Sequence, residues 1–226
     1  MQRLQSSLDA YVATQAPMLS TTYDWDFEPA IPQTSFGITV AGNNWMVKNL
    51  DLKEKLAQAW GTANPSQLLG LAHYYVVIWG GIRAIQMPTL QRHLALVTGG
   101  GGYPIDGIAS WSKIATISDP TRYAIFDARV AFSLNALQVL SGLGGSNRFP
   151  KLSSRNGVIK RVGEKLDAYA RRHAWPDVPR SQVYPLYLKL LGHAAGGIRQ
   201  PMALARAEMV LFAMAEALAL AVEPHL

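Results

Sequence analysis

Two short motifs in the middle of the chain carry residue types that could do chemistry together. The first, Tyr103-Pro104-Ile105-Asp106-Gly107, combines a proline that fixes φ with a glycine that adopts positive φ freely. Such a turn before a helix leaves backbone N–H groups that can bind a phosphate without reading base sequence. The second, Phe126-Asp127-Ala128-Arg129-Val130, places one carboxylate where a helix should begin. That carboxylate could cap the helix or stabilise positive charge on a sugar that is losing its base.

The residues between the two motifs predict the element that connects them. Their apolar pattern indicates a helix over 108–117. Asp119-Pro120 should end that helix, because the residue before a proline disfavours helical backbone. Asp127 follows Gly107 by 20 residues.

This combination resembles the motif of the helix-hairpin-helix DNA glycosylases. The turn at 103–107 is similar to their Leu-Pro-Gly-x-Gly hairpin, and their catalytic aspartate follows at the spacing seen here. The stretch 119–130 is similar to their approach to that aspartate, and 79–83 falls where they enter the minor groove. In particular, the chain resembles bacterial proteins with the 8-oxoguanine-DNA-glycosylase fold, some of which act against phages with modified DNA. The likeness covers residues 65–140, and elsewhere only helical character is shared.

The resemblance implies an all-α, helix-hairpin-helix glycosylase fold, with two helical lobes around a central cleft and Asp127 as the catalytic carboxylate. Bifunctional members of the superfamily place a nucleophilic lysine one or two positions after the second glycine, where this chain has Ile108 and Ala109. The resemblance therefore implies a monofunctional enzyme that uses water. Lys113, a helical turn further along, is the alternative nucleophile.

The resemblance also implies which residues contact double-stranded DNA and a modified base. The backbone at Gly107, Ile108 and Ser110 would hold a phosphate, and a monovalent cation could share that hairpin; no other cofactor and no metal is expected. The other candidates for DNA contact are Arg83, Gln86, Lys151, Arg155 and Lys160. A base extruded from the stack needs aromatic or apolar walls. The candidates for that pocket are Trp45, Trp79, Trp111 and Phe149, each of which could instead pack in the core.

Positive charge is concentrated in one segment. Residues 148–172 hold eight Lys and Arg against two acidic residues, Glu164 and Asp167. The net charge of this segment, +6, therefore equals the net charge of the whole chain. A local basic field attracts a polyanion and speeds its arrival. The alternative is a solvated helix face with a chance excess of cations.

The remaining sequence predicts a mainly helical protein. We expect one glycosylase-like unit over 1–226, with lobes formed by 49–140 and by 1–48 plus 141–226. Residues 17–46 and 142–156 should be irregular, apart from one short strand over 36–40. Asn49 or Asp51 should cap the helix that runs to Trp60. The expected helices span 4–13, 49–60, 64–79, 88–97, 108–117, 127–140, 158–173, 181–191 and 201–222.

Composition excludes several kinds of site. The chain has no cysteine, which rules out disulfides, thiolate zinc sites and a cysteine nucleophile, and fits a cytoplasmic protein. Its five histidines show no metal-binding spacing, and it contains no phosphate-binding glycine fingerprint. The sequence predicts no membrane span and implies no obligate protein partner.

Three functions therefore stay open on sequence. The first is a DNA glycosylase that excises a modified base, with a hypermodified phage cytosine, such as a glucosylated one, ahead of 8-oxoguanine as substrate. The second is a DNA-binding module that has the hairpin but no chemistry. The third is a helical scaffold with no role at nucleic acids.

Overall fold

The computed structural model describes residues 2–142 and 147–226, and these fall into two compact units. Residues 23–125 form a unit that we call the inserted unit, because the other unit lies on both sides of it in sequence. Residues 1–22 and 126–226 form that other unit, the terminal unit. The expected lobes place these boundaries elsewhere, at 48/49 and 140/141. The division at 125/126 assigns the hairpin to the inserted unit and Asp127 to the terminal unit.

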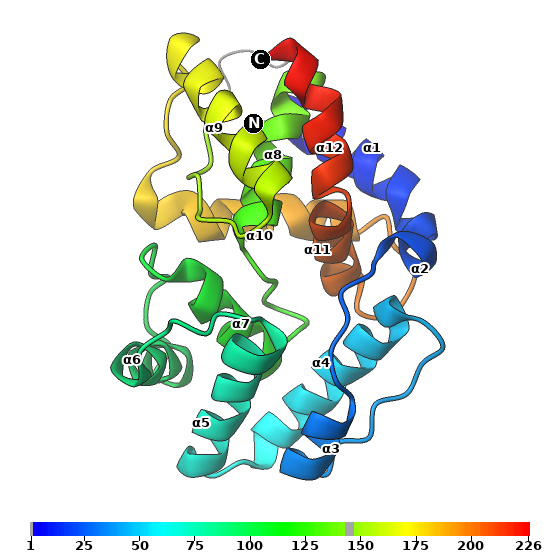
Figure 1. Cartoon of the computed structure of the whole chain (residues 1–226), viewed down its shortest axis with the longest axis vertical. Coiled ribbons are helices and arrows are strands. Elements are labelled where there is room, and N and C mark those ends of the chain that lie inside the picture. The colour runs from blue at the N-terminus through cyan, green and yellow to red at the C-terminus, as the bar shows by residue number, and fades with distance from the viewer. Residues whose placement is uncertain (1, 143–146) are drawn as a thin grey trace. The chain divides into compact units, whose positions relative to one another are not determined.

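The inserted unit is helical (Figure 1). Helix α7 packs against both α4 and α6, so the element that follows the hairpin lies in the middle of the unit. A buried apolar cluster around Leu52, Tyr75 and Ile117 forms its core. Its elements are α3 (Ala30–Phe36), α4 (Trp45–Thr62), α5 (Pro65–His73), the π-helical η2 (Tyr74–Trp79), α6 (Met87–Thr98) and α7 (Ile108–Ser118).

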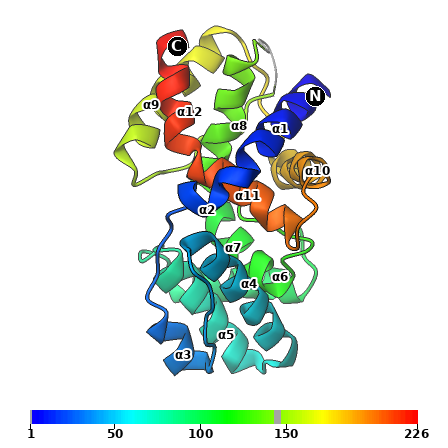
Figure 2. The ribbon, with the colours of Figure 1, turned by 90° about the vertical axis from the view of Figure 1, so that its right-hand side faces the viewer.

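The terminal unit is built from both sides of the insertion. Helix α8, which Asp127 begins, packs against α1, α9, α11 and α12, and Figure 2 shows α8, α9 and α12 side by side. Its elements are α1 (Gln2–Gln15), η1 (Ala16–Met18), α2 (Leu19–Thr22), α8 (Ala128–Leu140), α9 (Gly157–Arg172), η3 (Arg180–Gln182), α10 (Val183–Ala195), α11 (Ala203–Ala213), α12 (Ala215–Val222) and η4 (Glu223–His225).

The all-α expectation is confirmed, because the described residues form helices and no strand. The short strand expected over 36–40 is therefore wrong. Helix α3 ends at Phe36, and Gly37 follows in the left-handed conformation at φ 69°. The cap expected at Asn49 or Asp51 is also wrong, because the Asn44 side chain accepts the N–H of Val47 and α4 begins at Trp45.

The start of α5 agrees with its local sequence signals. The Asn64 side chain accepts the N–H of Gln67, and the Gln67 side chain accepts the N–H of Asn64 in return. The helix expected over 64–79 changes to a π-helical turn at Tyr74, and the rings of Tyr75 and Trp79 stack 4.1 Å apart within that turn. The single helix expected over 201–222 is two helices, which meet at Met214.

Candidate active site

The turn before α7 has the backbone that the sequence predicts. Gly107 precedes the helix in the left-handed conformation, with φ 73° and ψ 20°. The N–H of Ile108 donates to the Ile105 carbonyl at 3.3 Å, which closes the turn. The N–H groups of Ser110 and Trp111 both donate to the Gly107 carbonyl at 3.0 Å. In this turn the N–H groups of Gly107 and Ala109 are the ones that have no acceptor among the described residues.

A buried histidine supports this turn from below. His93, on α6, is fully buried, and its Nδ1 lies 3.2 Å from the Ser110 hydroxyl. That hydroxyl donates to the Gly107 carbonyl at 2.8 Å. A Cβ on Gly107 would lie 2.6 Å from His93 Cε1, so the ring also fills the space that a side chain would need. His93 was not among the predicted site residues, although its position on the apolar face of α6, beside Leu90, was a signal.

The DNA contacts predicted near the hairpin separate into two kinds. The side chains of Ile108 and Ser110 are buried, and their N–H groups donate to the carbonyls of Ile105 and Gly107, so neither residue offers a free donor to a phosphate in this conformation. Arg83 and Gln86 lie in the segment between η2 and α6 and are exposed, as a residue that enters a groove must be. Arg83 forms no ion pair with any residue in the described part of the chain.

The buried His93 predicts an acid sensitivity. Burial, with the Arg92 charge adding to it, lowers the pKa of His93, while the Asp106 carbonyl acts in the opposite direction. Below the ordinary pKa of 6.5 the unfolded chain therefore binds a proton that the folded chain resists, so stability falls as the pH drops. We expect the free energy of unfolding, measured by urea titration, to fall between pH 7 and pH 5 by up to about 1.4 kcal/mol per pH unit. His93→Gln should flatten this dependence, and the same change at the exposed His173 should not; an unchanged slope in His93→Gln would contradict the assignment.

Asp127 caps the N-terminus of α8, as predicted, and one of its two carboxylate oxygens accepts the capping hydrogen bonds. Oδ1 accepts the N–H groups of Arg129 and Val130 at 3.0 and 3.1 Å. Oδ2 makes no hydrogen bond or ion pair with any residue that the structure describes. The side chain is only partly buried. One oxygen therefore fixes the orientation of the carboxylate and the other remains available.

Arg129, which is close to Asp127 in sequence, forms an ion pair with a different carboxylate. Arg129 donates to Glu216 at 3.2 Å and lies over the ring of Phe212 at 4.7 Å. The amide of Asn156 donates to the same Glu216 oxygen at 2.7 Å. Glu216 on α12 thus takes up the arginine closest in sequence to Asp127, so this guanidinium does not neutralise the carboxylate.

The environment behind Asp127 is apolar and aromatic. Phe126 is fully buried, and its ring centre lies 5.0 Å from that of Tyr187 on α10. Burial raises the pKa of Tyr187 well above its ordinary value, and the charges of Glu208 and Asp127 act in the same direction. Tyr187 therefore stays neutral beneath the start of α8.

Lys113, the alternative nucleophile, is buried on α7 with 5% of its surface exposed. Its Nζ lies 3.4 Å from the Ala109 carbonyl. A Cβ on Gly80 would lie 2.6 Å from Lys113 Cε, so the side chain packs against the end of η2. This packing favours a structural role over attack on a nucleotide.

Three of the four predicted pocket aromatics lie in the core. Trp79 is 6% exposed and donates its indole N–H to Asn49 at 2.8 Å, and Trp111 packs edge-on against Tyr103. Phe149 is fully buried. Trp45 is partly exposed and packs against Phe27. None of the three buried rings presents a face to a base in this conformation.

The basic segment is neutralised at half of its cations. Arg148 pairs with Asp167 at 2.9 Å and Asp177 at 2.6 Å, and the Asp177 contact is the largest cause of the raised pKa of Arg148. Arg161 and Lys165 share Glu223, and Arg171 pairs with Asp167. The four that form no ion pair within the described residues are Lys151, Arg155, Lys160 and Arg172.

The described residues contain no group of three histidines and carboxylates that could hold a metal ion, and none of their helices has the length and hydropathy of a membrane span. The hairpin and Asp127 each have the local geometry described above within their own unit. No family model, curated protein or solved structure matches the chain.

Proposed function

We propose that the protein is a DNA glycosylase that extrudes a modified base from double-stranded DNA and hydrolyses its N-glycosidic bond. The proposal depends on how the hydrogen bonds of Asp127 orient its carboxylate. Its Oδ1 is fixed by two backbone N–H groups, and its Oδ2 has no partner among the described residues. An oriented carboxylate with one available oxygen suits the stabilisation of an oxocarbenium-like sugar.

The proposed reaction is a hydrolysis in which water is the only second reactant. The bond between C1′ and the base nitrogen breaks, and its electron pair leaves with the base. The carboxylate of Asp127 stabilises the positive charge on the sugar, and the oxygen of a water molecule bonds to C1′. The water loses a proton as it bonds to C1′, the departing base takes up one proton in exchange, and an abasic site with a hydroxyl group at C1′ remains in the strand.

The proposed binding mode is mainly to phosphates. The N–H groups of Gly107 and Ala109, which have no acceptor among the described residues, support one phosphate contact at the start of α7. Lys151, Arg155 and Lys160 are exposed cations without carboxylate partners among the described residues. The proposed substrate is a hypermodified cytosine, since the chain lacks a lysine just after Gly107; 8-oxoguanine is the second candidate.

Base release tests the proposal directly. The protein is incubated with genomic DNAs that carry glucosylated cytosine, 5-hydroxymethylcytosine, 8-oxoguanine or no modification, and released bases are identified by mass spectrometry. We expect one modified base to be released, and the product strand to break only on treatment with alkali. DNA binding without any release would favour the non-catalytic module instead, and absence of binding would exclude both the enzyme and the module.

The unpaired cations of the basic segment predict a salt effect. Exchange of Arg155 and Lys160 for glutamine should weaken DNA binding and reduce the slope of log K against log salt by about 0.9 for each phosphate that is no longer neutralised. Arg161→Gln is the matched control, because Glu223 already neutralises that guanidinium. Fluorescence anisotropy at several salt concentrations measures the slopes, and an effect at Arg161 equal to that at Lys160 would contradict the assignment.

A further inference from the structure

The starts of three helices in the terminal unit are joined by one carboxylate, that of Glu216 in the first turn of α12. Its Oε1 accepts a guanidinium N–H of Arg129, at the start of α8, at 3.2 Å. The same oxygen accepts the side-chain amide of Asn156, just before α9, at 2.7 Å. Asn156 also accepts the N–H of Ile159 at 3.0 Å and so caps α9. The Glu216 carboxylate is therefore held between donors whose own positions are set by helix starts.

The backbone and the side chain of Arg129 serve different partners. Its backbone N–H donates to Asp127 Oδ1 at 3.0 Å and so helps to orient the proposed catalytic carboxylate. Its side chain pairs with Glu216 and lies over the ring of Phe212, 4.7 Å from the ring centre. Phe212 and Glu216 lie on either side of the junction between α11 and α12. Two separate contacts thus hold the guanidinium on these helices.

A guanidinium that was not held there would act against the proposed chemistry. The long arginine side chain can reach a carboxylate two residues away, and it forms strong paired bonds with carboxylate oxygens. Oδ2 of Asp127 is the oxygen that has no partner among the described residues. A guanidinium bound to Oδ2 would occupy that oxygen and offset its negative charge. The same positive charge would also repel the cationic sugar.

From these contacts we infer that Glu216 is a positioning residue of the proposed reaction, which holds the Arg129 guanidinium away from Asp127 Oδ2 and offsets its positive charge. This inference rests on the proposed function. Glu216 touches neither the sugar nor the base, so it acts only through Arg129. Its contribution is to the rate of base release rather than to stability, because a half-exposed ion pair stabilises a fold only slightly.

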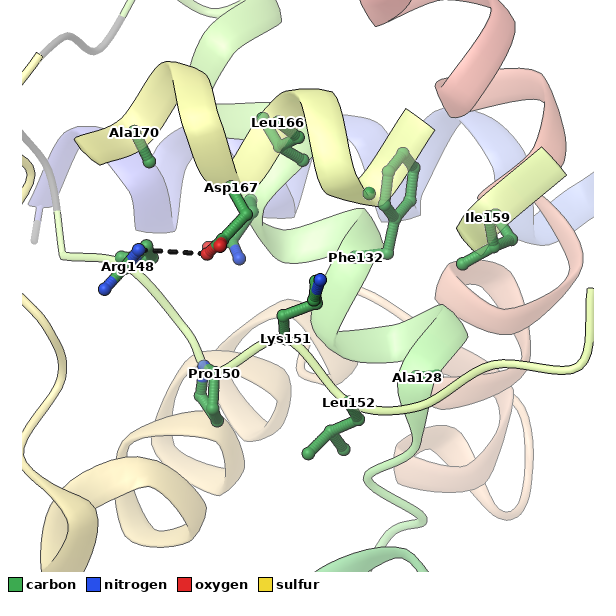
Figure 3. Close-up of a pocket in the computed structure, with 12 residues that line it drawn as sticks. Ala128, Phe132, Arg148, Pro150, Lys151, Leu152, Ile159, Leu166, Asp167 and Ala170 are labelled. Atoms are coloured by element: carbon green, nitrogen blue, oxygen red, sulfur yellow. Dashed lines mark hydrogen bonds and ion pairs between the residues drawn. The ribbon is translucent and has the colours of Figure 1, made fainter. Parts of the chain in front are cut away.

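Other charged and titratable groups surround the start of α8 and stay unchanged in the test. Tyr187 on α10 and Glu208 on α11 are buried, and the charge of Asp127 acts on Tyr187. On the side of α9, Arg148 is already paired with a carboxylate, as the dashed line in Figure 3 shows. The Lys151 side chain rises from the loop beside α8 (Figure 3). A test of Glu216 must therefore separate the charge of Arg129 from these other charges.

Removal of one charge, followed by removal of its partner, isolates Arg129. Glu216→Gln keeps an oxygen that can accept the Asn156 amide, but its bond to the guanidinium is weaker because it is no longer charge-assisted. Arg129→Gln in the same chain then removes the cation while its backbone N–H remains for Asp127. Glu223→Gln is the matched control, because Glu223 also binds two cations, both on α9, beyond the other end of α12. Thermal unfolding shows that each variant is folded, and Glu216→Asp is the smaller change if the glutamine prevents folding.

Three measurements are made on each variant. Single-turnover release at saturating protein gives the rate, and fluorescence anisotropy gives the DNA affinity. Carbon-13 NMR follows the titration of the Asp127 carboxylate without DNA, with Asp127→Asn to assign the signal. We expect Glu216→Gln to slow release about tenfold without weakening DNA binding, and to lower the midpoint of that titration by about one pH unit, because a nearby cation favours the ionised carboxylate. The added Arg129→Gln should restore both, and Glu223→Gln should change neither.

The outcomes separate this inference from the glycosylase proposal. Release from Glu216→Gln at the unchanged rate overturns the inference and leaves the glycosylase standing. Slow release that Arg129→Gln does not restore also overturns it, because Glu216 would then only link the helices. If the unchanged protein releases no base from any DNA, the glycosylase fails and the NMR titration decides the inference. A lowered midpoint that Arg129→Gln reverses then supports it, and an unchanged midpoint overturns it.

Discussion

Asp127→Asn should slow base release by about 100–1,000-fold while DNA binding persists. Asparagine caps helices about as well as aspartate, so the bonds to the N–H groups of Arg129 and Val130 can survive the change. What is lost is the negative charge that opposes the cationic sugar. Removal of a stabilising group of this kind costs about 100–1,000-fold in rate. Single-turnover release of the modified base, with anisotropy for DNA affinity, measures both quantities.

Asp119→Asn is the matched control for this variant. Asp119 is also a loop aspartate, and its Oδ1 accepts from the N–H groups of Thr121 and Arg122. It undergoes the same loss of charge in the inserted unit, so an effect of charge alone would appear in both variants. Equal rates of release from Asp127→Asn and the unchanged protein would remove Asp127 from the mechanism.

Gly107→Ala should lower the free energy of unfolding for two separate reasons, its backbone conformation and its contact with His93. The left-handed backbone at φ 73° costs a residue with a Cβ about 1–2 kcal/mol. The new Cβ would also lie 2.6 Å from His93 Cε1, and overpacking of this kind costs a further 1–3 kcal/mol or so. Urea unfolding should show both losses together, and the displaced turn should also weaken DNA binding.

Gly37→Ala separates the two causes. Gly37 has nearly the same backbone, at φ 69°, but a Cβ there meets nothing within 4 Å. It should therefore show the backbone cost without the clash, and its DNA affinity should not change. His93→Ala combined with Gly107→Ala should recover the part of the loss that the clash causes. Equal destabilisation by Gly37→Ala and Gly107→Ala would show that the His93 ring moves away from the new methyl group with no loss of stability.

The parts of the fold that were predicted correctly depend on neighbours in sequence. Asp127 caps α8 because an aspartate before an apolar helix supplies the acceptor that its own backbone needs. Helix α5 begins directly after Asn64 as expected, because a proline is tolerated in the first turn of a helix. The left-handed Gly107 follows from a glycine placed directly before a helix.

The parts that were predicted wrongly depend on contacts between distant residues or on very short elements. Asn49 was expected at a cap, yet it lies inside α4, where it bonds the carbonyl of Trp25 and the indole of Trp79. Helices as short as α2 and α3 have too few residues to show a period.

The candidate site could be predicted only where charge or backbone decides the outcome. Whether Trp79 and Phe149 face a base or the core depends on tertiary packing, which a sequence pattern does not show. The basic segment is visible in sequence, but its partial neutralisation is not, because Glu223 reaches Arg161 and Lys165 from the last helical turn.

The division of the terminal unit across the chain has a consequence for how the protein is made on the ribosome. The Gln5 side chain of α1 donates to the Leu190 carbonyl, and Asp9 pairs with His193, so these partners of α1 are synthesised only after the inserted unit. Until α10 emerges, the apolar face of α1 lacks the helix against which it packs. The inserted unit is contiguous and can reach its native state earlier. We therefore expect the half that carries Asp127 to be the later to fold, and the one more prone to aggregation during synthesis.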